Sequence, residues 1–498
     1  MRELLLGVDV GTTATKAVLI DFDGKFVSQG RAEHPTHHSK AGWAEQEAED
    51  WWRSFCEAVS IAKNNAANSK IAAVLISSQA PSMLPVDGNG KPIRKALIWM
   101  DRRAEPQAQE LLKNFPNVSS ITGNRADPFY IAAKIKWLKD NEPDNYEKTK
   151  YILQIPGFLN FKLTGKFGTD RSHTSMFQLR DRENNNWHRE IGNFVGANQE
   201  MFGEVGESTK LFGEVSPSNE SGIAAGTPVY FGTVDGCSAA VEAGVIDPGI
   251  IAEMSGTSTV LLMPTEGQVF NDQFIAIEHA IPNRNLRLGA MVSSGASIAW
   301  LEQNIFKGHT SIPDLMAKSV SVPAGSAGLV FLPYMMGERS PIWNSNARGV
   351  FYGLSLATTA EMIFRATLEG TAFAMRHNVL AAKDSGIRAE VVRSLGGGTR
   401  NNLWNQIKAD VLGIPVVTIA ESSGAALGCA YLAGFGLGVF KDIREPLNAN
   451  LKIERTFEPN PKVQDLYLEQ FQVYRNIYES TKVEFDKLAK ITELGANL

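Results

Sequence analysis

The stretch Gly7-Val8-Asp9-Val10-Gly11-Thr12-Thr13 lies between two apolar segments and predicts a strand, a tight turn and a second strand. Gly11 permits a tight turn and, having no side chain, lets a ligand approach the backbone. Thr12 and Thr13 offer hydroxyl and N–H groups to a phosphate. Asp9 places a carboxylate where a phosphate-bound cation would bind, because hard cations prefer oxygen ligands. A short cluster of this kind also occurs in ordinary hairpin turns, so the rest of the chain must decide.

The composition is that of a globular protein with at least two domains. The chain has 498 residues, of which 43% are hydrophobic and 21% charged, and one hydrophobic core does not usually extend over such a length. The formal net charge is −5, and Lys and Arg form no cluster along the sequence. A basic patch is the usual sign of a nucleic-acid partner, so we expect none.

The cysteines and the apolar segments bear on location. Cys56, Cys237 and Cys429 are scattered without the spacing of a disulfide framework or a zinc site, and they suit a reducing compartment. Glu3 and Asp9 interrupt the first apolar run, which is too short for a signal peptide. No run reaches the roughly 20 apolar residues of a membrane span. We therefore expect a cytoplasmic protein without a membrane partner.

The first half of the chain has the alternating order of an α/β domain. Polar residues gather where expected strands end, as at Gln79 and Trp99, and such strand ends are where α/β proteins bind ligands. The expected elements are strands on both sides of the Gly-Thr turn, strands at 25–31, 71–77 and 228–233, a helix at 47–63, helical structure across 127–170 and a helix that starts near Asp235.

The opening pattern returns after Asp247-Pro248-Gly249, where we place a boundary between domains at 1–246 and 247–498. A strand at 250–254 leads into Ser255-Gly256-Thr257, and further strands follow. We interpret this as an internal repeat of two related domains. Ser255 is assigned the place of Asp9, so only the first domain would supply the cation-linked carboxylate.

A third glycine-rich turn, Gly396-Gly397-Gly398, follows an expected strand at 391–395. The elements expected around it are a strand at 274–281, a helix from 401 to 413, a strand at 415–419, a helix at 423–428 and a long amphipathic helix at 455–490. Three such turns at strand ends in one cleft could hold a triphosphate and a nucleoside, because backbone N–H groups in turns form anion-binding concavities.

Several other sites are excluded by the absence of their motifs. No Gly-x-x-x-x-Gly-Lys-Ser/Thr occurs, and no Gly-x-Gly-x-x-Gly follows a strand, which argues against a P-loop and a dinucleotide fold. The eight histidines lack ligand spacing. His173 and His377 are therefore interpreted as structural or surface residues.

Taken together, these motifs resemble the FGGY carbohydrate kinases, within the wider group that also holds actin and the heat-shock chaperones, and the xylulokinase-like branch in particular. The resemblance extends over nearly the whole chain. The matching segments are 9–13, 99–103, 134–138, 235–236, 255–257, 337–339, 347–354, 396–398 and 401–402.

The resemblance implies two ribonuclease-H-like domains, with ATP and a sugar in the cleft between them. It places Asp9 near magnesium and the phosphates, and it makes Asp235 the catalytic base. The implied ATP-binding residues are Asp9, Gly11, Thr12, Thr13, Gly256, Thr257, Gly397 and Asn401. The implied sugar-pocket residues are Gln79, Trp99, Asp101, Arg102 and Asp235. Arg102 equally suits a structural ion pair.

The chemistry of Asp235 agrees with the implied role. A sugar hydroxyl is a poor nucleophile until its proton has an acceptor, and a carboxylate within hydrogen-bond reach can take that proton as the oxygen–phosphorus bond forms. Asp235 lies where a strand becomes a helix, which is a fixed position. Asp is also a good helix cap, and both roles could hold together.

The identity of the sugar stays open. Xylulokinases carry Met-His-Gly, and glycerol kinases Arg-Glu-Thr, after the glutamine that corresponds to Gln79, whereas this chain has Ala80-Pro81-Ser82. The side chains of Ala and Pro cannot replace those hydrogen bonds to the substrate. We predict a magnesium- and ATP-dependent kinase of a small sugar such as the ketopentose xylulose. The alternatives are another sugar, sugar acid or polyol (gluconate, erythritol, glycerol, ribulose) and a nucleotide-switched binding protein. Whether the chain forms a homodimer is left open.

Overall fold

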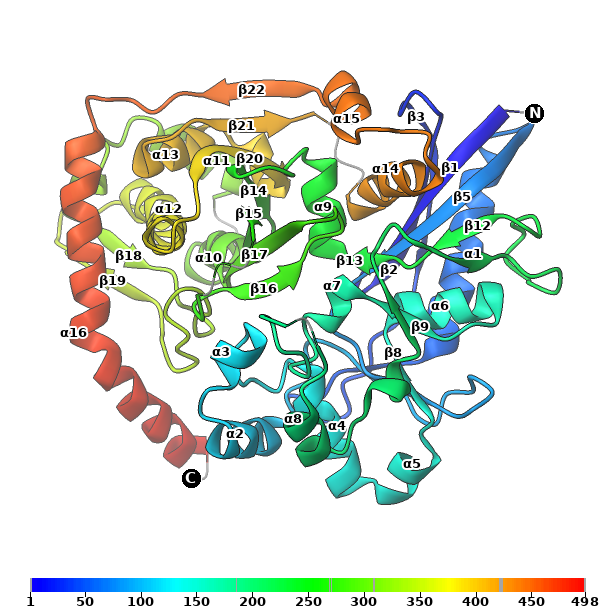
Figure 1. Ribbon diagram of the computed structural model, residues 1–498. Helices are drawn as coiled ribbons and strands as arrows, with labels where there is room; N and C mark the ends of the chain where they lie inside the picture. The colour runs from blue at the N-terminus through cyan, green and yellow to red at the C-terminus, as the bar shows by residue number, and fades with distance from the viewer. Residues whose placement is uncertain are drawn as a thin grey trace. The chain divides into compact units, whose positions relative to one another are not determined.

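The computed structural model describes residues 2–184, 186–267, 269, 271–307, 310–420 and 424–496 (Figure 1). It is a mixed α/β structure with two compact units. The first contains Met1–Ile246, Glu266–Leu286 and Ser423–Leu451. The second contains Asp247–Thr265, Arg287–Ser422 and Lys452–Leu498. The chain first changes unit between residues 246 and 247, and two later segments return to the first unit.

The sheet of the first unit is built around β1 and β5. Its strand order is β11-β12-β5-β1-β2-β3, and β13 also pairs with β5. Strands β1, β2 and β3 are antiparallel, as predicted, whereas β5 runs parallel to β1. These strands are β1 (Arg2–Val10), β2 (Ala14–Ile20), β3 (Phe26–Glu33), β5 (Ser69–Ser78), β11 (Leu211–Glu214), β12 (Pro228–Tyr230) and β13 (Thr233–Val234).

Helices cover both faces of this sheet. Alternate residues of β1 point to opposite faces, and Val8 belongs to a buried cluster that also contains Trp51 and Phe55 of helix α1 (Ala48–Asn64). On the other face, a Cβ atom at Gly7 would lie 2.1 Å from the carbonyl oxygen of Ala426, in helix α14 (Ala425–Leu437). Glycine at position 7 therefore lets α14 pack directly on β1.

The remaining elements of the first unit are short. Residues 127–170, predicted to be helical with interruptions at Pro and Gly, contain three helices but also the strands β8 (Tyr151–Leu153) and β9 (Gly168–Asp170), so that prediction is partly wrong. The helices are α2 (Glu105–Asn114), α3 (Val118–Thr122), α4 (Ile131–Asn141), α5 (Pro143–Lys148), α6 (Ile155–Thr164), α7 (Arg171–Thr174), α8 (Arg189–Val195), α9 (Asp235–Glu242), α15 (Arg444–Asn450) and a 3₁₀ helix (Gln199–Phe202). The strands are β4 (Glu45–Gln46), β6 (Leu84–Val86), β7 (Ala96–Leu97), β8 (Tyr151–Leu153), β9 (Gly168–Asp170), β10 (Glu204–Gly206) and β16 (Ile275–Glu278).

The second unit contains strands in the order β17-β15-β14-β20-β21-β22. The strands are β14 (Gly249–Ser255), β15 (Thr259–Glu266), β17 (Arg284–Met291), β18 (Val330–Leu332), β19 (Val350–Tyr352), β20 (Ala389–Gly396), β21 (Val416–Ile419) and β22 (Ile453–Phe457). The helices are α10 (Ser294–Trp300), α11 (Ile312–Ser319), α12 (Ala360–Asp384), α13 (Asn402–Leu412) and α16 (Gln464–Ala496). The predicted end of α13 at Gly413 is confirmed, because Gly413 caps it with a φ of 73°.

Two predictions near the C-terminus need comment. The long helix predicted at 455–490 begins later, because residues 453–457 form β22 and Thr418 of β21 pairs with Arg455. Pro459 and Pro461 separate that strand from α16, and proline inside a helix removes a backbone donor and clashes with the preceding turn. The helix predicted at 423–428 is observed as α14, and residue 423 lies outside the described residues.

The repeat is present, but its predicted alignment is wrong by one residue. In the first hairpin Val10 pairs with Thr15, and in the second Ser255 pairs with Thr259. Ser255 therefore takes the place of Val10, and Met254 takes the place of Asp9. The burial pattern agrees, because both of these central residues are partly exposed between buried neighbours. Only the first hairpin carries a carboxylate at this position.

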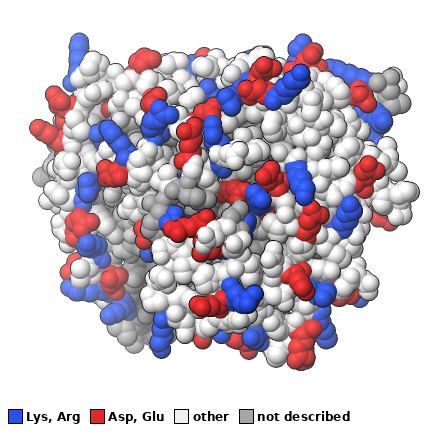
Figure 2. Space-filling view, in the orientation of Figure 1, with Lys and Arg blue, Asp and Glu red and all other residues white. Residues whose placement is uncertain are grey.

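Charged groups of both signs are scattered over the surface that Figure 2 draws. Lys and Arg are interspersed with Asp and Glu on that face, which agrees with the small net charge of −5. Among the residues that the structure describes, no helix has both the length and the apolar composition of a membrane span.

Candidate active site

The register of three strands brings Asp9 and Asp235 to one edge of the first sheet. Ser77 of β5 pairs with Asp9 of β1 and with Thr233 of β13, and both neighbours run parallel to β5. Parallel strands in register end at the same edge of a sheet. Helix α9 starts at Asp235, two residues after Thr233. The structure thus places both predicted carboxylates where ligand sites of α/β sheets are found.

Asp9 is a carboxyl with a perturbed pKa. Its Oδ1 accepts a hydrogen bond of 2.8 Å from the Ser77 hydroxyl. Burial raises the pKa of Asp9 to about 6, although the Ser77 hydrogen bond and the charge of Lys16 act in the opposite direction. Ser77 was not among the residues predicted for the site, since a serine at the end of a buried strand belongs to no motif.

Asp235 differs from an ordinary helix cap. The N-cap residue of α9 is Val234, and Asp235 is the first helical residue. Its Oδ1 accepts a hydrogen bond of 2.7 Å from the N–H of Gly236. Burial, and after it the negative charge of Asp9, raises the pKa of Asp235 to about 7. A carboxyl with a pKa near neutrality is suited to proton transfer.

The paired carboxylates fit a cation that is carried by phosphates. Asp9 raises the pKa of Asp235, and a divalent cation beside them would relieve that repulsion. Mg²⁺ is usually held by one or two carboxylates together with substrate phosphates. Within the described part of the chain, no group of three or more His, Cys, Asp or Glu side chains forms a metal cage. The donor set therefore suits a phosphate-bound magnesium better than a resident metal.

The carbonyl groups of the turn at 11–13 accept hydrogen bonds from residues behind it. Nε2 of His34 donates to the Gly11 carbonyl at 3.0 Å, and Nε2 of Gln46 donates to the Thr12 carbonyl at 2.7 Å. The N–H of His34 donates to the Thr13 carbonyl at 3.1 Å. These contacts fix the turn from its carbonyl side. Sequence reasoning missed His34 and Gln46, because neither belongs to a recognisable motif.

Gln79 and Trp99 meet at the side chain of Thr12. The Thr12 hydroxyl donates to Oε1 of Gln79 at 3.0 Å and accepts from Nε1 of Trp99 at 3.2 Å. Nε2 of Gln79 donates to Gln46 at 2.7 Å, and Gln79 is only 2% exposed. Gln79 therefore orients the turn. Its predicted contact with a sugar, like that of Trp99, stays a prediction.

Asp101 and Arg102 are held in ion pairs. Asp101 is fully buried, and Oδ2 accepts hydrogen bonds of 2.7 Å from Arg103 and from the N–H of Ala44. Arg102 pairs with Asp127 at 2.6 Å, which matches the structural alternative for this residue. Sugar contacts of Asp101 and Arg102 stay predictions.

The other two glycine turns lie together in the second unit. Ser255, which precedes the turn at 256–257, pairs with Gly396, and a Cβ atom at Gly398 would lie 2.3 Å from Oγ of Ser255. Behind the turn, the N–H of Ala296 in α10 donates to the Thr257 carbonyl at 3.0 Å. Asn401 caps α13 by accepting from the N–H of Trp404 at 3.0 Å. ATP contacts of Gly256, Thr257, Gly397 and Asn401 stay predictions.

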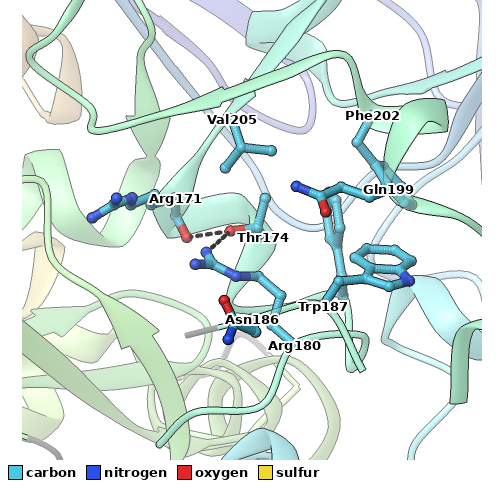
Figure 3. Close-up of a pocket in the computed structure, with 9 residues that line it drawn as sticks. Arg171, Thr174, Arg180, Asn186, Trp187, Gln199, Phe202 and Val205 are labelled. Carbon is cyan, nitrogen blue, oxygen red and sulfur yellow. Dashed lines mark hydrogen bonds between the residues drawn. The ribbon is translucent and has the colours of Figure 1, made fainter. Parts of the chain in front are cut away.

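A separate pocket of about 200 Å³ lies in the first unit (Figure 3). The pocket contains none of the predicted site residues, although α7 contributes to its wall. The residues that line it are Arg171, Thr174, Phe177, Arg180, Asn186, Trp187, Gln199, Phe202 and Val205.

The chain is similar to several known sugar and polyol kinases. The chain is 28% identical over 485 residues to the xylulose kinase of Bacillus subtilis, covering 96% of this chain and 97% of that one. It is 28% identical over 472 residues to the glycerol kinase of Thermococcus gammatolerans, and the match covers 92% of this chain and 94% of that one. The crystal structure of a gluconate kinase from Lactobacillus acidophilus superposes with a TM-score of 0.93 at 25% identity, covering 98% and 100%.

Two domain families match the chain directly. Residues 4–242 match the N-terminal domain of the FGGY carbohydrate kinases, and residues 252–437 match the C-terminal domain. Together the two matches extend over most of the 498 residues, and they contain Asp9, Asp235 and all three glycine turns. The chain belongs to the FGGY family of carbohydrate kinases.

Proposed function

We propose that this kinase transfers the γ-phosphate of ATP to a hydroxyl of a small sugar, with Asp235 as the general base. The observation that carries the proposal is the pairing of Asp235 with Asp9 at one sheet edge. Burial and the charge of Asp9 raise the pKa of Asp235 to about 7. A base with such a pKa can accept a proton near neutral pH. The family relationship supplies the phosphate donor, ATP.

In the proposed phosphoryl transfer, Asp235 accepts the proton that the sugar hydroxyl loses. The hydroxyl oxygen of the sugar forms a bond to the γ-phosphorus while the bond between that phosphorus and the β,γ-bridging oxygen breaks. Asp235 takes the hydroxyl proton, and ADP leaves. In such reactions most of the catalysis comes from positioning and electrostatic stabilisation, so the fixed start of α9 matters as much as the basicity of Asp235.

We propose that Asp9 holds magnesium on the phosphates. When bound, the cation would neutralise charge on the phosphate oxygens. Thr12 and Thr13 would then bind phosphate from the first unit, and Gly256 and Thr257 from the second. Gly397 and Asn401 would border the adenosine. In both units the turn carbonyls accept hydrogen bonds from neighbouring residues. These bonds support phosphate binding by the turns, because they fix the turn backbones before a ligand binds.

We propose a ketopentose such as xylulose as the sugar. The support is the similarity to proteins named xylulose kinase over nearly the whole chain. In the segment Ala80-Pro81-Ser82, the side chains of Ala and Pro offer no hydrogen bonds that would select a pattern of sugar hydroxyls. The backbone N–H of Ser82 donates a hydrogen bond of 2.9 Å to Oε1 of Gln154. Gluconate, erythritol, glycerol and ribulose are the alternatives.

We infer a cytoplasmic location from the cysteines. Cys56, Cys237 and Cys429 are free thiols, and free thiols are typical of reducing compartments.

The deciding experiment is a coupled ADP-release assay over pentuloses, hexuloses, tetritols, glycerol and gluconate, with ³¹P NMR of the product. We expect one sugar class to raise ATP turnover well above the sugar-free rate, and xylulose to be in that class. Phosphorylation of another compound would replace the ketopentose. If no compound raised turnover, a nucleotide-switched binding protein would become the better description.

A further inference from the structure

A buried polar network lies behind β13, the strand that leads to Asp235. It consists of Asp170, Ser172 and His173, each at most 1% exposed. Ser172 and His173 belong to α7, and the side chain of Asp170 caps that helix by accepting from the N–H of His173. Because these side chains are buried, none can contact a substrate, and any influence on the reaction must pass through neighbouring residues.

Ser172 connects this network to the residue before Asp235. The N–H of Val234 donates to Oγ of Ser172 at 2.9 Å, and the Ser172 hydroxyl donates to Oδ1 of Asp170. Oγ of Ser172 also lies 3.0 Å from Oγ1 of Thr233. Both residues of β13 are therefore held by one serine, and Asp235 is the next residue along the chain.

His173 connects the same carboxylate to β5. Its Nδ1 lies 2.6 Å from Oδ2 of Asp170, and its Nε2 lies 3.3 Å from Oγ of Ser78. Ser78 is the sheet partner of Val234. The Asp170–His173 pair thus contacts the end of β5 directly through His173 and reaches the end of β13 through Ser172. This buried position agrees with the structural role predicted for His173.

Thr174 faces the pocket of Figure 3 and makes different contacts. Its hydroxyl donates to the carbonyl oxygen of Arg171 at 3.0 Å and accepts from Nη1 of Arg180 at 2.8 Å. Thr174 therefore shares α7 with Ser172 but has no hydrogen bond to β13 among those described. The same short helix offers a test residue and a matched control.

We propose that Ser172 is a positioning residue for Asp235, holding the N–H of Val234 while Asp170 and His173 hold Ser172. The inference rests on the proposed function, since it requires Asp235 to be the base. A general base must lie within hydrogen-bond reach of the proton that it takes. A misplacement of about 1 Å can lower the rate by about 10²-fold. Loss of the Ser172 hydroxyl would remove the acceptor that fixes Val234.

The first test compares Ser172→Ala with Thr174→Val. We expect Ser172→Ala to lower kcat by about 10- to 100-fold, while KM for sugar and for ATP changes by less than about threefold because no substrate contact is removed. Thr174→Val should keep kcat within about twofold of the wild type, since β13 is untouched. Equal kcat values for the two variants would overturn the proposal.

A double-mutant cycle separates positioning from a general structural effect. If Ser172 acts through Asp235, then Ser172→Ala should cost nothing further in an Asp235→Asn background. If the fold-losses in kcat of the two single variants multiply in the double variant, the positioning role is overturned and the base assignment stays intact. Near-normal activity of Asp235→Asn alone would instead overturn the proposed function. Should the Ser172→Ala variant fail to bind ATP or to unfold cooperatively, Asp170→Asn takes its place in the same cycle, because asparagine keeps the shape of the aspartate side chain.

Discussion

The first Gly-Thr hairpin has one more loop residue than the second, and the two carry different chemistry. The N–H of Gly11 donates to the Ala14 carbonyl at 3.0 Å, and the N–H of Gly256 donates to the Ser258 carbonyl at 2.9 Å. Asp9 stands before the first turn, whereas Met254 occupies the matching position of the second. Both hairpins thus contain a Gly-Thr turn, whereas only the first has a carboxylate at the matched position.

The nearest carboxylate of the second hairpin, Glu253, faces the core. It lies one residue before Met254, and consecutive strand residues point to opposite faces. Its carboxylate pairs with Lys408 at 2.6 Å and accepts from the Ser394 hydroxyl at 2.7 Å. A shift of one residue along a strand therefore separates the position of the proposed cation ligand from that of a buried structural ion pair.

The largest expected difference between the two units concerns their buried carboxyls. Asp235→Asn should lower kcat by about 10²- to 10⁴-fold, because the hydroxyl proton loses its acceptor. ATP binding, measured by calorimetry, should persist. In the second unit, burial raises the pKa of Glu338 to about 8. Glu338→Gln should nevertheless keep wild-type activity, and a large loss there would contradict the assignment of catalysis to the first unit.

The second comparison substitutes the matched positions before the turns. Asp9→Asn should raise the Mg²⁺ concentration for half-maximal activity by about 10- to 100-fold, as expected when a metal partner is weakened. Met254→Leu should leave that concentration unchanged, because no ligand is lost. The measurement is initial rate against Mg²⁺ at fixed ATP. Equal responses of the two variants would mean that the hairpins do not differ in cation binding.

The third comparison tests whether both turns bind phosphate. A Cβ atom would lie 3.4 Å from its nearest neighbour at Gly11 and 3.7 Å at Gly256, so alanine fits at either site. Each variant, Gly11→Ala and Gly256→Ala, should raise KM for ATP by about tenfold, or about 1.4 kcal/mol, with little change in Tm.

Gly396→Ala serves as the control for fold damage. At Gly396 φ is 88°, and a Cβ atom would lie 2.4 Å from the Ser255 carbonyl, so this substitution should lower Tm. If Gly11→Ala or Gly256→Ala lowered Tm as much, a change in KM could not be assigned to phosphate contact.

The smallest expected effect is a dependence of the free energy of unfolding on pH, caused by Glu338 in the second unit. Oε1 of Glu338 accepts hydrogen bonds of 2.8 Å from the N–H groups of Val292 and Arg339. Burial raises the pKa from 4.5 to about 8, so the folded protein binds this proton more tightly than the unfolded chain does. The stabilisation is complete below the unfolded pKa and is lost as pH rises through about 8.

Glu338→Gln isolates this contribution, because glutamine can accept the same backbone hydrogen bonds and does not titrate. In urea unfolding between pH 5 and 9, the free energy of unfolding of the wild type should fall relative to that of the variant. Parallel pH profiles for the two proteins would rule out Glu338 as the source.

Local patterns in the sequence were enough for much of the fold. Apolar runs on both sides of a Gly-Thr turn predicted β1 and β2, and Gly413 marked the end of α13, because such runs and helix caps depend on neighbours in sequence. Asp235 was likewise found at its strand-to-helix junction. The FGGY motifs, being short and ordered along the chain, carried the family assignment.

Tertiary contacts determined the structural features that local sequence patterns did not predict. Residues 455–457 form a strand because β21 supplies their hydrogen-bond partners, although their sequence also suited a helix. The register of the second hairpin, which aligns Met254 with Asp9, depends on pairing with β15. The carboxylate of Asp101 pairs with its sequence neighbour Arg103, but only folding brought the N–H of Ala44 to it.

By itself, the amino-acid sequence determined that the protein has two α/β repeats with Gly-Thr turns and one candidate base. Only the tertiary structure decided that the charge of Asp9 raises the pKa of Asp235, and that Ser172 lies behind the strand leading to Asp235. The reason is physical: backbone preference acts over a few residues, whereas burial and charge coupling depend on groups brought together from distant parts of the chain.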